Sequence, residues 1–427
     1  MRVSEDRLIS DLTELGKIGA KQGTGRTRLV LTLEDFEARK FLMIRMKQAR
    51  LQVRVDQVGN IIGRRGSPKN KLPILAFGSH IDTVPNAGML DGCYGVMAGL
   101  EVVRTLNDNN VQTRHPLEVI SFSNEEGVRY PMMIGSKVAA GIMDLNAAYE
   151  LRDNAGTTYR QALESGGLAQ SSLVRAHRLP GEIRSWLELH IEQGPILEKE
   201  GARIGVVEAI VGLVHLLVTI QGRAGHAGST PMNARQDALL GSAEIILEVN
   251  RIAKELSSSS VGTVGLLHVR PGAMNVIPGV VDMGIDFRDI SGERMDQGIE
   301  KIRASIGEVC KRLGLDHAIV ERSRLVPQPM SKRLMNSIER AAKVLGVTYK
   351  VMPSGAGHDT QNMTRICETG MIFVPSRNGI SHAPEEWTDP ADLALGADVL
   401  LHTLIDLDGT LENIRLGYNL PVFYQKI

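Results

Sequence analysis

The sequence Leu72-Pro-Ile-Leu-Ala-Phe77, followed by Gly78-Ser-His-Ile-Asp82, decides the fold. The apolar run predicts a buried strand. The polar residues after it predict a site, because open α/β sheets bind ligands at the carboxyl ends of their strands. The same arrangement recurs where the apolar run Leu117–Phe122 is followed by Ser123-Asn-Glu-Glu-Gly127. The sequence therefore predicts an α/β protein with its site at one edge of an open sheet.

The residues at these strand ends are those of a metal site. His80 is followed eleven positions later by Asp91, and Glu125 and Glu126 form an acidic pair after the second strand. A histidine, a carboxylate and an acidic pair are the parts needed to hold two metal ions and to leave one carboxylate free as a base. The sequence therefore predicts a metal-dependent hydrolase.

Composition limits the class of protein. The 427 residues favour two domains, and 43% hydrophobic with 23% charged residues is typical of a soluble globular chain. Lys plus Arg and Asp plus Glu number 49 each, and aromatic residues make up only 4%, which argues against nucleic-acid binding. The three cysteines, Cys93, Cys310 and Cys367, fit a reducing compartment rather than a disulfide framework. We see neither a signal peptide nor an apolar run long enough to span a membrane, so we expect a cytoplasmic protein.

Helical periodicity predicts two helices near the start of the chain. Leu8, Leu12 and Leu15 recur at helical spacing after a possible cap at Ser4. The sequence Thr32-Leu-Glu-Asp35 predicts a capping box that opens a second helix, which runs to about residue 50. A third helix, over residues 95–106, is expected between the two site-bearing strands.

Alternation of polar and apolar residues from Trp186 to Gly194 predicts a further strand. It places Glu188, His190 and Glu192 on one face. A later apolar run, Gly370–Val374, predicts a buried strand, and His382 lies in the loop just past it.

The pattern changes at about residue 208. From there the sequence predicts the order β-α-β-β-α-β, which is the ferredoxin-like signature. The six elements are expected over residues 211–221, 234–256, 261–269, 280–288, 294–313 and 318–322. We therefore expect a compact domain of residues 209–325 inserted into a domain formed by residues 1–208 and 326–427. No element is predicted for residues 408–427.

A paired divalent site without thiolates needs imidazole and carboxylate ligands, one of which bridges two ions ~3.5–4 Å apart. The candidate ligands are His80, Asp91, Glu126, His190 and His382. Asp82 follows His80 by two residues and is expected to accept the other N–H of that imidazole.

Nine motifs, spread in order over nearly the whole chain, carry a family resemblance. They are Gly78-Ser-His-Ile-Asp-Thr-Val84, Leu90-Asp-Gly92, Glu125-Glu-Gly127, Glu188-Leu-His-Ile-Glu-Gln-Gly194, Gly225-His-Ala-Gly-Ser-Thr-Pro231, Asn275-Val-Ile-Pro278, Asp286-Phe-Arg-Asp289, Gly355-Ala-Gly-His-Asp359 and Gly379-Ile-Ser-His382. With these motifs the chain resembles the hydantoinase/carbamoylase branch of the M20 peptidase family. The resemblance implies a zinc-peptidase-like α/β catalytic domain with an inserted ferredoxin-like α+β domain that serves as a dimerisation and lid domain.

The resemblance also implies the roles of the metal-site residues. One ion takes His80, Asp91 and His190, and the other takes Asp91, Glu126 and His382, so that Asp91 bridges. Glu125 acts as the base and Asp82 supports the site. The family uses zinc, manganese, cobalt or nickel, and a nitrogen and oxygen ligand set does not choose among them.

Substrate contacts and assembly are likewise implied by the resemblance. His226 from the small domain would stabilise the oxyanion, although a polar loop residue is the alternative for this histidine. Arg288 would bind the substrate carboxylate, although a surface salt bridge is the alternative. Gln193, Asn275 and Gly357 match further substrate contacts. The family's small domain dimerises and delivers its histidine to the partner's site, which implies a homodimer with shared sites.

Several activities remain open at this point. The leading one is hydrolysis of an N-carbamoyl-L-amino acid to the amino acid, carbon dioxide and ammonia, and allantoate hydrolysis is the close alternative. His190 replaces the acid of M20 aminoacylases and peptidases, which argues against that activity. A non-catalytic binding protein on the same fold has no need for the free carboxylate of Glu125.

Overall fold

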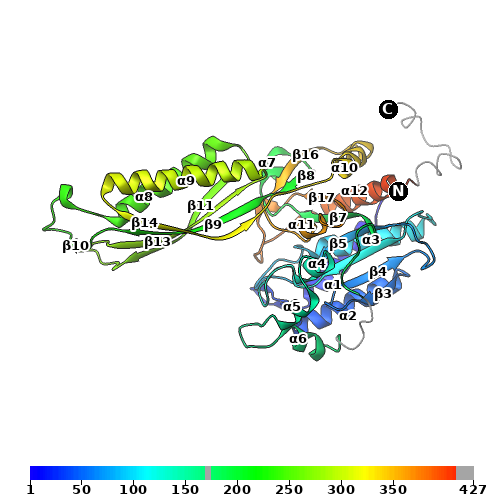
Figure 1. Cartoon of the computed structure of the whole chain (residues 1–427). Coiled ribbons are helices and arrows are strands. Elements are labelled where there is room, and N and C mark those ends of the chain that lie inside the picture. The colour runs from blue at the N-terminus through cyan, green and yellow to red at the C-terminus, as the bar shows by residue number, and fades with distance from the viewer. Residues whose placement is uncertain (169–174, 410–427) are drawn as a thin grey trace. The chain divides into compact units, whose positions relative to one another are not determined.

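The computed structural model describes residues 1–168 and 175–409, so the segment 408–427, for which no element is predicted, lies almost wholly outside the described residues. The chain forms two compact units (Figure 1). Unit 1 comprises Met1–Glu208, Met330–Met352 and the chain from Gly357 onward, and unit 2 comprises Ala209–Pro329 and Pro353–Ala356. No helix in the described part of the chain is both long and apolar enough to cross a membrane.

The sheet of unit 1 brings four parallel strand ends to one edge. Its strand order is β8-β17-β7-β5-β6-β4-β3, with β16 beside β8. The central strands β5 (Ile74–His80), β6 (Leu117–Phe122), β7 (Ile183–Ile191) and β17 (Glu368–Val374) are mutually parallel. The outer strands are β3 (Gln52–Val55), β4 (Ile61–Arg65), β8 (Ile204–Ile210) and β16 (Tyr349–Ser354). The predicted strands 72–77, 117–122 and 370–374 correspond to β5, β6 and β17.

Alternate residues of β5 pack into two different cores, which is why its first four residues, 74–77, are all apolar. Leu75 and Phe77 pack among α1 (Glu5–Lys17), α3 (Cys93–Asp108), α10 (Lys332–Leu345) and α12 (Pro390–Asp408). Ile74 and Ala76 pack on the opposite side with Trp186 of β7. A strand that is buried on both faces is what a continuous apolar run predicts.

The remaining elements are short or peripheral. They are β1 (Ala20–Lys21), β2 (Gly25–Arg26), α2 (Leu33–Gln48), α4 (Ile134–Ala139), α5 (Leu145–Glu150), α6 (Tyr159–Ser165), α7 (Ile196–Glu200), β10 (Gly225–His226), the 3₁₀ turn Met232–Ala234, β12 (Val276–Ile277), β15 (Gln328–Pro329), α11 (Thr360–Met363) and the 3₁₀ turn Arg377–Gly379.

The two predicted N-terminal helices form, but only one is capped as predicted. The Ser4 side chain accepts the N–H of Arg7 at the start of α1. At the start of α2 the predicted capping box is wrong, because the Thr32 hydroxyl donates to the carbonyl of Leu29 and caps nothing. The Asp35 carboxylate accepts the N–H of Leu31 at 2.7 Å, one residue before the expected partner. The helix therefore begins as predicted with a different hydrogen-bond pattern.

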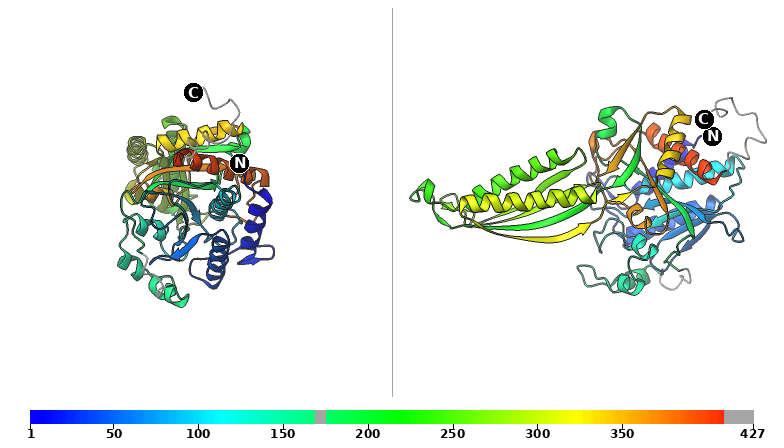
Figure 2. Two further views of the ribbon diagram at one scale, coloured as in Figure 1. Left: turned by 90° about the vertical axis from the view of Figure 1, so that its right-hand side faces the viewer. Right: turned by 45° about the horizontal axis from the view of Figure 1, so that its top comes forward.

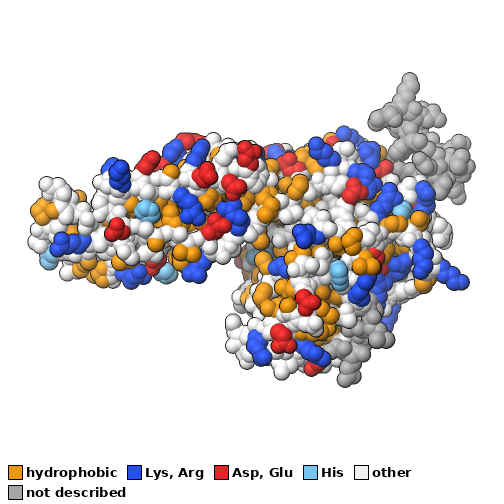
Figure 3. Space-filling view, in the orientation of Figure 1, with side chains coloured by type: hydrophobic (Ala, Val, Ile, Leu, Met, Phe, Trp, Pro, Cys, Tyr) orange, Lys and Arg blue, Asp and Glu red, His pale blue; other side chains and the backbone are white. Residues whose placement is uncertain are grey.

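Unit 2 has the predicted order of elements. These are β9 (Gly212–Gln221), α8 (Ala238–Leu256), β11 (Val261–Arg270), β13 (Val280–Asp289), α9 (Gly292–Leu313) and β14 (Asp316–Leu325). The four strands form an antiparallel sheet in the order β11-β13-β9-β14, and α8 and α9 lie side by side along one face of it (Figures 1 and 2). The helix predicted from residue 234 begins at Ala238, because Asp237 caps it by accepting the N–H groups of Leu239 and Leu240. On the face of unit 2 seen in Figure 3, side chains of both charges are interspersed.

Candidate metal centre

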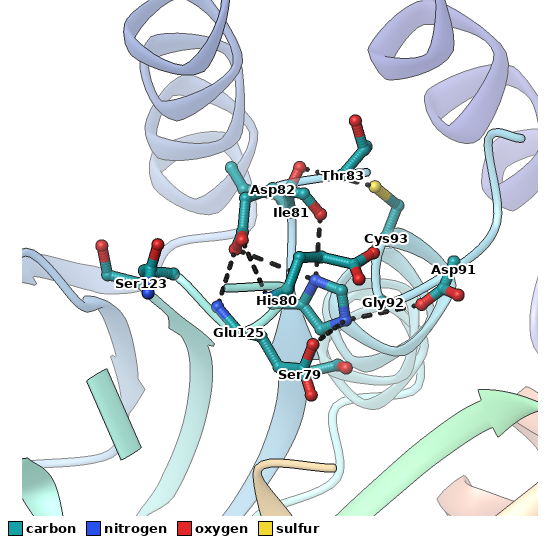
Figure 4. Close-up of polar contacts among 12 residues, drawn as sticks. Ser79, His80, Ile81, Asp82, Thr83, Asp91, Gly92, Cys93, Ser123 and Glu125 are labelled. Atoms are coloured by element: carbon teal, nitrogen blue, oxygen red, sulfur yellow. Dashed lines mark hydrogen bonds and ion pairs between the residues drawn. The ribbon is translucent and has the colours of Figure 1, made fainter. Parts of the chain in front are cut away.

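The five predicted ligand residues gather at the carboxyl edge of the unit 1 sheet. His80 ends β5, His190 lies in β7, Glu126 follows β6, and Asp91 and His382 come from the loops before α3 and after β17. They form two groups, one of His80, Asp91 and His190 and one of Asp91, Glu126 and His382, and within each group the ligand atoms lie within 4.8 Å of one another. Part of the first group is seen in Figure 4.

Asp91 belongs to both groups because each of its carboxylate oxygens faces one of them. Its Oδ1 lies 3.5 Å from His80 Nε2 and 3.2 Å from His190 Nε2. Its Oδ2 lies 3.1 Å from His382 Nε2, and that nitrogen is 3.6 Å from Glu126 Oε2. A carboxylate placed in this way offers one oxygen to each of two cations.

The two buried imidazoles turn their Nε2 lone pairs toward Asp91. His80 Nδ1 contacts the main-chain oxygen of Asp82 at 3.0 Å, and His190 Nδ1 contacts that of Ile191 at 2.9 Å. A carbonyl oxygen only accepts, so in the neutral form of both rings the proton lies on Nδ1 and the lone pair on Nε2. This is the tautomer that a metal ligand needs. The sequence predicts that Asp82 accepts this N–H; in the structure its backbone oxygen makes the contact, and its carboxylate lies 3.8 Å from His80 Nδ1.

The carboxylate of Asp82 instead fixes the acidic pair. One oxygen accepts the N–H of Glu125 at 3.2 Å (Figure 4). The other accepts the N–H of Glu126, also at 3.2 Å. Glu125 Oε2 lies 3.6 Å from His80 Nε2, yet Glu125 is in neither ligand group. It is buried, and burial raises the pKa of its carboxyl well above the usual range. Asp82 thus holds Glu126 in place as a candidate ligand and Glu125 in place beside the ligand groups.

The donor set fits divalent cations. It contains only imidazole nitrogens and carboxylate oxygens, and Glu126 Oε1 is buried without a hydrogen-bond partner in the described chain. Burial raises the pKa of Glu126 to about 7, and the hydrogen bond to Asp91 raises that of His382 to about 9. A cation beside these side chains favours the ionised carboxylates and neutral imidazoles that metal binding requires. His80, Asp91, Glu126, His190 and His382 are therefore suited to hold it.

Two residues at the centre have roles that the sequence does not assign. Gly92 has φ +64, donates its N–H to His190 Nε2 at 3.1 Å, and leaves room for the His80 ring. Glu386 is buried, and its Oε1 accepts the N–H groups of Leu90 and Asp91 at 2.8 and 3.2 Å. The sequence gives a signal for both, because Gly92 belongs to the motif Leu90-Asp-Gly92 and Glu386 follows His382 by four positions.

Two predicted substrate residues lie in unit 1. Gln193 has φ +59, and its amide nitrogen donates to Asp91 Oδ2 at 2.7 Å, whereas its Oε1 is buried without a partner among the described residues. Gly357 immediately precedes His358, whose ring packs edge-on against that of His190 with 4.7 Å between the centroids. Both residues are therefore held next to the ligand groups.

The other three predicted substrate residues lie in unit 2, at opposite ends of β13. His226 pairs with Val276 in the β10–β12 ladder, and Ala227 donates its N–H to the carbonyl of Asn275 at 3.0 Å, just before β13 begins. Arg288 lies near the other end of β13. A strand rises ~3.4 Å per residue, so the ten residues of β13 separate Arg288 from the His226 region by roughly 30 Å.

Arg288 is already engaged by a carboxylate of its own strand. Its Nε and Nη2 each donate to Asp286 at 2.8 Å, and its Nη1 donates to the carbonyl of Gly355 at 2.8 Å. This is the salt bridge named as the alternative for Arg288. A guanidinium has five N–H groups, so one remains on Nη1 and one on Nη2 for a ligand.

Comparisons with known proteins agree with this architecture. Residues 76–406 match peptidase family M20/M25/M40. The chain is 42% identical to an N-carbamoyl-L-amino-acid amidohydrolase of Paenarthrobacter aurescens, over 95% of this chain and 99% of that protein. It is 36% identical to an allantoate amidohydrolase of Bacillus subtilis, over 95% and 98%. A crystal structure of a hydantoinase/carbamoylase family amidase from Burkholderia multivorans, 37% identical, superposes with a TM-score of 0.92 over 95% and 98% of the two chains. The fold, the ligand groups and these matches together place this chain in peptidase family M20/M25/M40.

Proposed function

We propose that this protein hydrolyses the ureido group of an N-carbamoyl-L-amino acid. One water is consumed, and the products are the L-amino acid, carbon dioxide and ammonia. The observation that carries the proposal is the pair of ligand groups that share Asp91, with Glu125 close to His80 but outside both groups. A relative that is similar over nearly its whole length is named for this activity.

The cofactor we propose is two divalent cations per subunit, zinc, manganese, cobalt or nickel, held by His80, Asp91 and His190 and by Asp91, Glu126 and His382. When bound, such cations polarise a carbonyl oxygen and lower the pKa of water to ~7. The chain's own residues supply the proton transfers. Glu125 takes a proton from the attacking water and returns it to the departing nitrogen. Asp82 keeps Glu125 in place through the backbone hydrogen bond at 3.2 Å.

Metal removal tests the proposed stoichiometry. Chelator-treated protein is expected to regain about two divalent ions per chain, because the ligand atoms form two groups. The reloaded protein should melt at a higher temperature, since a ligand that binds only the folded state stabilises it. Asp91→Asn should bind fewer than one ion, because Asp91 belongs to both groups. Elemental analysis and calorimetry measure these outcomes, and a single ion in the wild-type protein would contradict the paired site.

We propose a homodimer whose active sites are shared between subunits. The substrate contacts assigned by resemblance are His226, Asn275, Arg288, Gln193 and Gly357. A carbamoyl amino acid is far shorter than the roughly 30 Å of β13, so one molecule cannot touch both Arg288 and the His226 region of the same chain. Both sets of residues can act on substrate if His226 and Asn275 contact the substrate that is bound by the partner subunit.

The β11 edge of unit 2 supports this assembly. Leu240 and Leu247 of α8 are 50% and 70% exposed, and Val261 and Leu267 of the neighbouring edge strand β11 are 54% and 42% exposed. Strand edges with few charges invite pairing with another chain. The opposite edge strand, β14, carries Glu321, Arg322 and Arg324 and is protected by them. We therefore place the dimer contact on α8 and β11.

A substitution on α8 tests the dimer. Leu247→Glu places a charge in the proposed contact and is expected to raise the dimer dissociation constant by ~10-fold or more. Leu325→Glu, on β14, is the control, because Leu325 is 41% exposed but lies on the opposite edge strand. Sedimentation velocity measures both variants. A Leu247→Glu protein that stays dimeric at nanomolar concentration would exclude this surface.

A substrate screen tests the activity itself. Metal-stripped protein is reloaded with each metal in turn and assayed for ammonia release from a panel of N-carbamoyl-L-amino acids and from allantoate. We expect turnover of at least one carbamoyl-L-amino acid and none of its D-enantiomer. The second candidate, allantoate hydrolysis, is favoured by the relative from Bacillus subtilis. It would replace the first if allantoate alone were hydrolysed, and release of ammonia from neither would refute both.

A further inference from the structure

The ring of His226 is fixed by the turn that follows it. Its Nδ1 is 3.0 Å from the amide nitrogen of Gly228 and 3.2 Å from that of Ser229, and both amides donate to it. The Thr230 N–H also donates to the His226 carbonyl, which closes the turn. A backbone amide only donates, so Nδ1 must present its lone pair. In the neutral ring the proton therefore lies on Nε2, which makes no hydrogen bond to any described residue.

Arg235 holds this turn from the other side. Its Nη2 donates to the carbonyls of Ala227 and Thr230 at 2.6 and 3.0 Å, and its Nε donates to that of Thr230 at 3.1 Å. Within the described part of the chain Arg235 has no carboxylate partner, so backbone carbonyls alone engage its guanidinium.

Peptide geometry connects the two observations. In a trans peptide the C=O and the next N–H point in opposite directions. The Ala227 carbonyl and the Gly228 N–H belong to the same peptide. When Arg235 binds the carbonyl on one side, the N–H is turned to the other side, where it meets His226 Nδ1. The guanidinium therefore acts on the imidazole through one rigid peptide plane.

We propose that Arg235 is a positioning residue that keeps the His226 imidazole in its Nε2–H tautomer. The inference rests on the proposed function, in which Nε2–H donates to the oxyanion of the tetrahedral intermediate. In the other tautomer Nε2 carries a lone pair, which repels a negative oxygen instead of stabilising it. Arg235 thus determines whether His226 Nε2 donates or accepts a hydrogen bond, although Arg235 itself does not contact the substrate.

Kinetics of Arg235 variants give the first test. Removal of one oxyanion donor costs ~10²–10³ in kcat, and a partial loss of the correct tautomer should cost less, ~10- to 100-fold. We expect this fall in kcat for Arg235→Met, with KM within ~2-fold of the wild type because the donor acts in the transition state. Arg235→Lys, which still donates to the two carbonyls, should recover most of the rate. Arg303→Met is the matched control, since Arg303 of α9 pairs with Glu321 of β14, on the edge opposite the proposed dimer contact.

The tautomer itself is the decisive readout, and it does not depend on the substrate. In metal-loaded protein labelled with ¹⁵N-histidine, the His226 signals are assigned by their loss in His226→Gln. We expect a protonated Nε2 and an unprotonated Nδ1 in the wild type, and a mixed or reversed pattern in Arg235→Met. The same wild-type pattern in Arg235→Met would overturn the proposal. Failure of the substrate screen would leave this spectrum interpretable, so the two failures are distinguishable.

A double-mutant cycle separates the tautomer from a general loss of structure. The amide of His226→Gln has no tautomers, so Arg235→Met is expected to change kcat less than ~2-fold in that background. An equal fall in both backgrounds would show that Arg235 supports the fold of the turn and not the protonation of the ring. Metal content and dimer content are measured for each variant to ensure that the compared proteins are loaded and assembled alike.

Discussion

Glu125→Gln is expected to lower the rate of hydrolysis by ~10²- to 10⁴-fold, which is the contribution of a general base. Glutamine keeps the shape of the side chain but cannot take a proton from water. The Glu125 N–H, which holds the residue to Asp82, belongs to the backbone and is unaffected. Because Glu125 lies outside both ligand groups, the variant should still bind about two ions per chain. Ammonia release and elemental analysis on the same sample measure the two effects.

The neighbouring acid provides the control. Glu126 is held by the other oxygen of Asp82 but belongs to the group with Asp91 and His382. Glu126→Gln is therefore expected to lower metal content, and activity should fall in proportion to the lost metal. If Glu125→Gln turned over substrate within tenfold of the wild type, Glu125 would not be the base. If it instead lost metal as Glu126→Gln does, Glu125 would be a ligand.

The parts of the fold that follow from local pattern were predictable. β5 and β6 are rich in apolar residues because both faces of these strands are buried, and their carboxyl ends lead into His80 and the acidic pair. In unit 2, β13 alternates strictly between buried and partly exposed residues because α8 and α9 cover one face of its sheet. Such patterns involve only neighbouring residues of the sequence, so the sequence alone suffices to predict these strands.

The alternation over β7 predicts which side chains lie on the same face of the strand but not what each side chain does. It places Glu188, His190 and Glu192 on one face, and the three have different roles. Glu188 accepts hydrogen bonds from the hydroxyls of Ser79 and Thr360, His190 faces Asp91, and Glu192 accepts the N–H groups that begin α7. A period of two residues fixes the face of a side chain, whereas its partner is fixed by another segment of the chain.

The contacts that complete the centre could not be predicted for the same reason. Glu386 reaches the backbone of Leu90 and Asp91 across 296 and 295 residues, and no local pattern encodes that approach. At His80 the prediction chose the Asp82 carboxylate on its spacing, but the backbone oxygen of the same residue lies closer. The spacing in the sequence indicates that Asp82 lies beside His80, whereas the φ and ψ angles of the loop determine which oxygen of Asp82 meets the ring.

Gly92→Ala is expected to abolish activity while the protein still folds. A Cβ on Gly92 would lie 2.4 Å from both Cε1 and Nε2 of His80, closer than real Cβ contacts come. The His80 ring cannot retreat, because its Nδ1 is tied to the Asp82 carbonyl and the residue is buried. The ring or the Asp91–Gly92 loop must therefore shift, and both belong to the group with His190. A displacement of ~1 Å in an active site costs ~10²-fold or more, so we expect activity below ~1% of the wild type and a lower metal content.

Gly156→Ala separates this effect from backbone strain. Gly156 has φ +83, comparable to the +64 of Gly92, but an added Cβ there meets nothing within 4 Å. A positive φ costs a non-glycine residue about 1–2 kcal/mol of unfolding free energy at Gly156. The cost is at least as large at Gly92, whose ψ of −48 lies outside the left-handed helical region. Denaturant unfolding should therefore show a loss of this size in Gly156→Ala, with full metal content and wild-type activity. Gly92→Ala should lose at least as much stability and its metal as well. Equal activity in the two variants would mean that the space beside His80 is not what Gly92 provides.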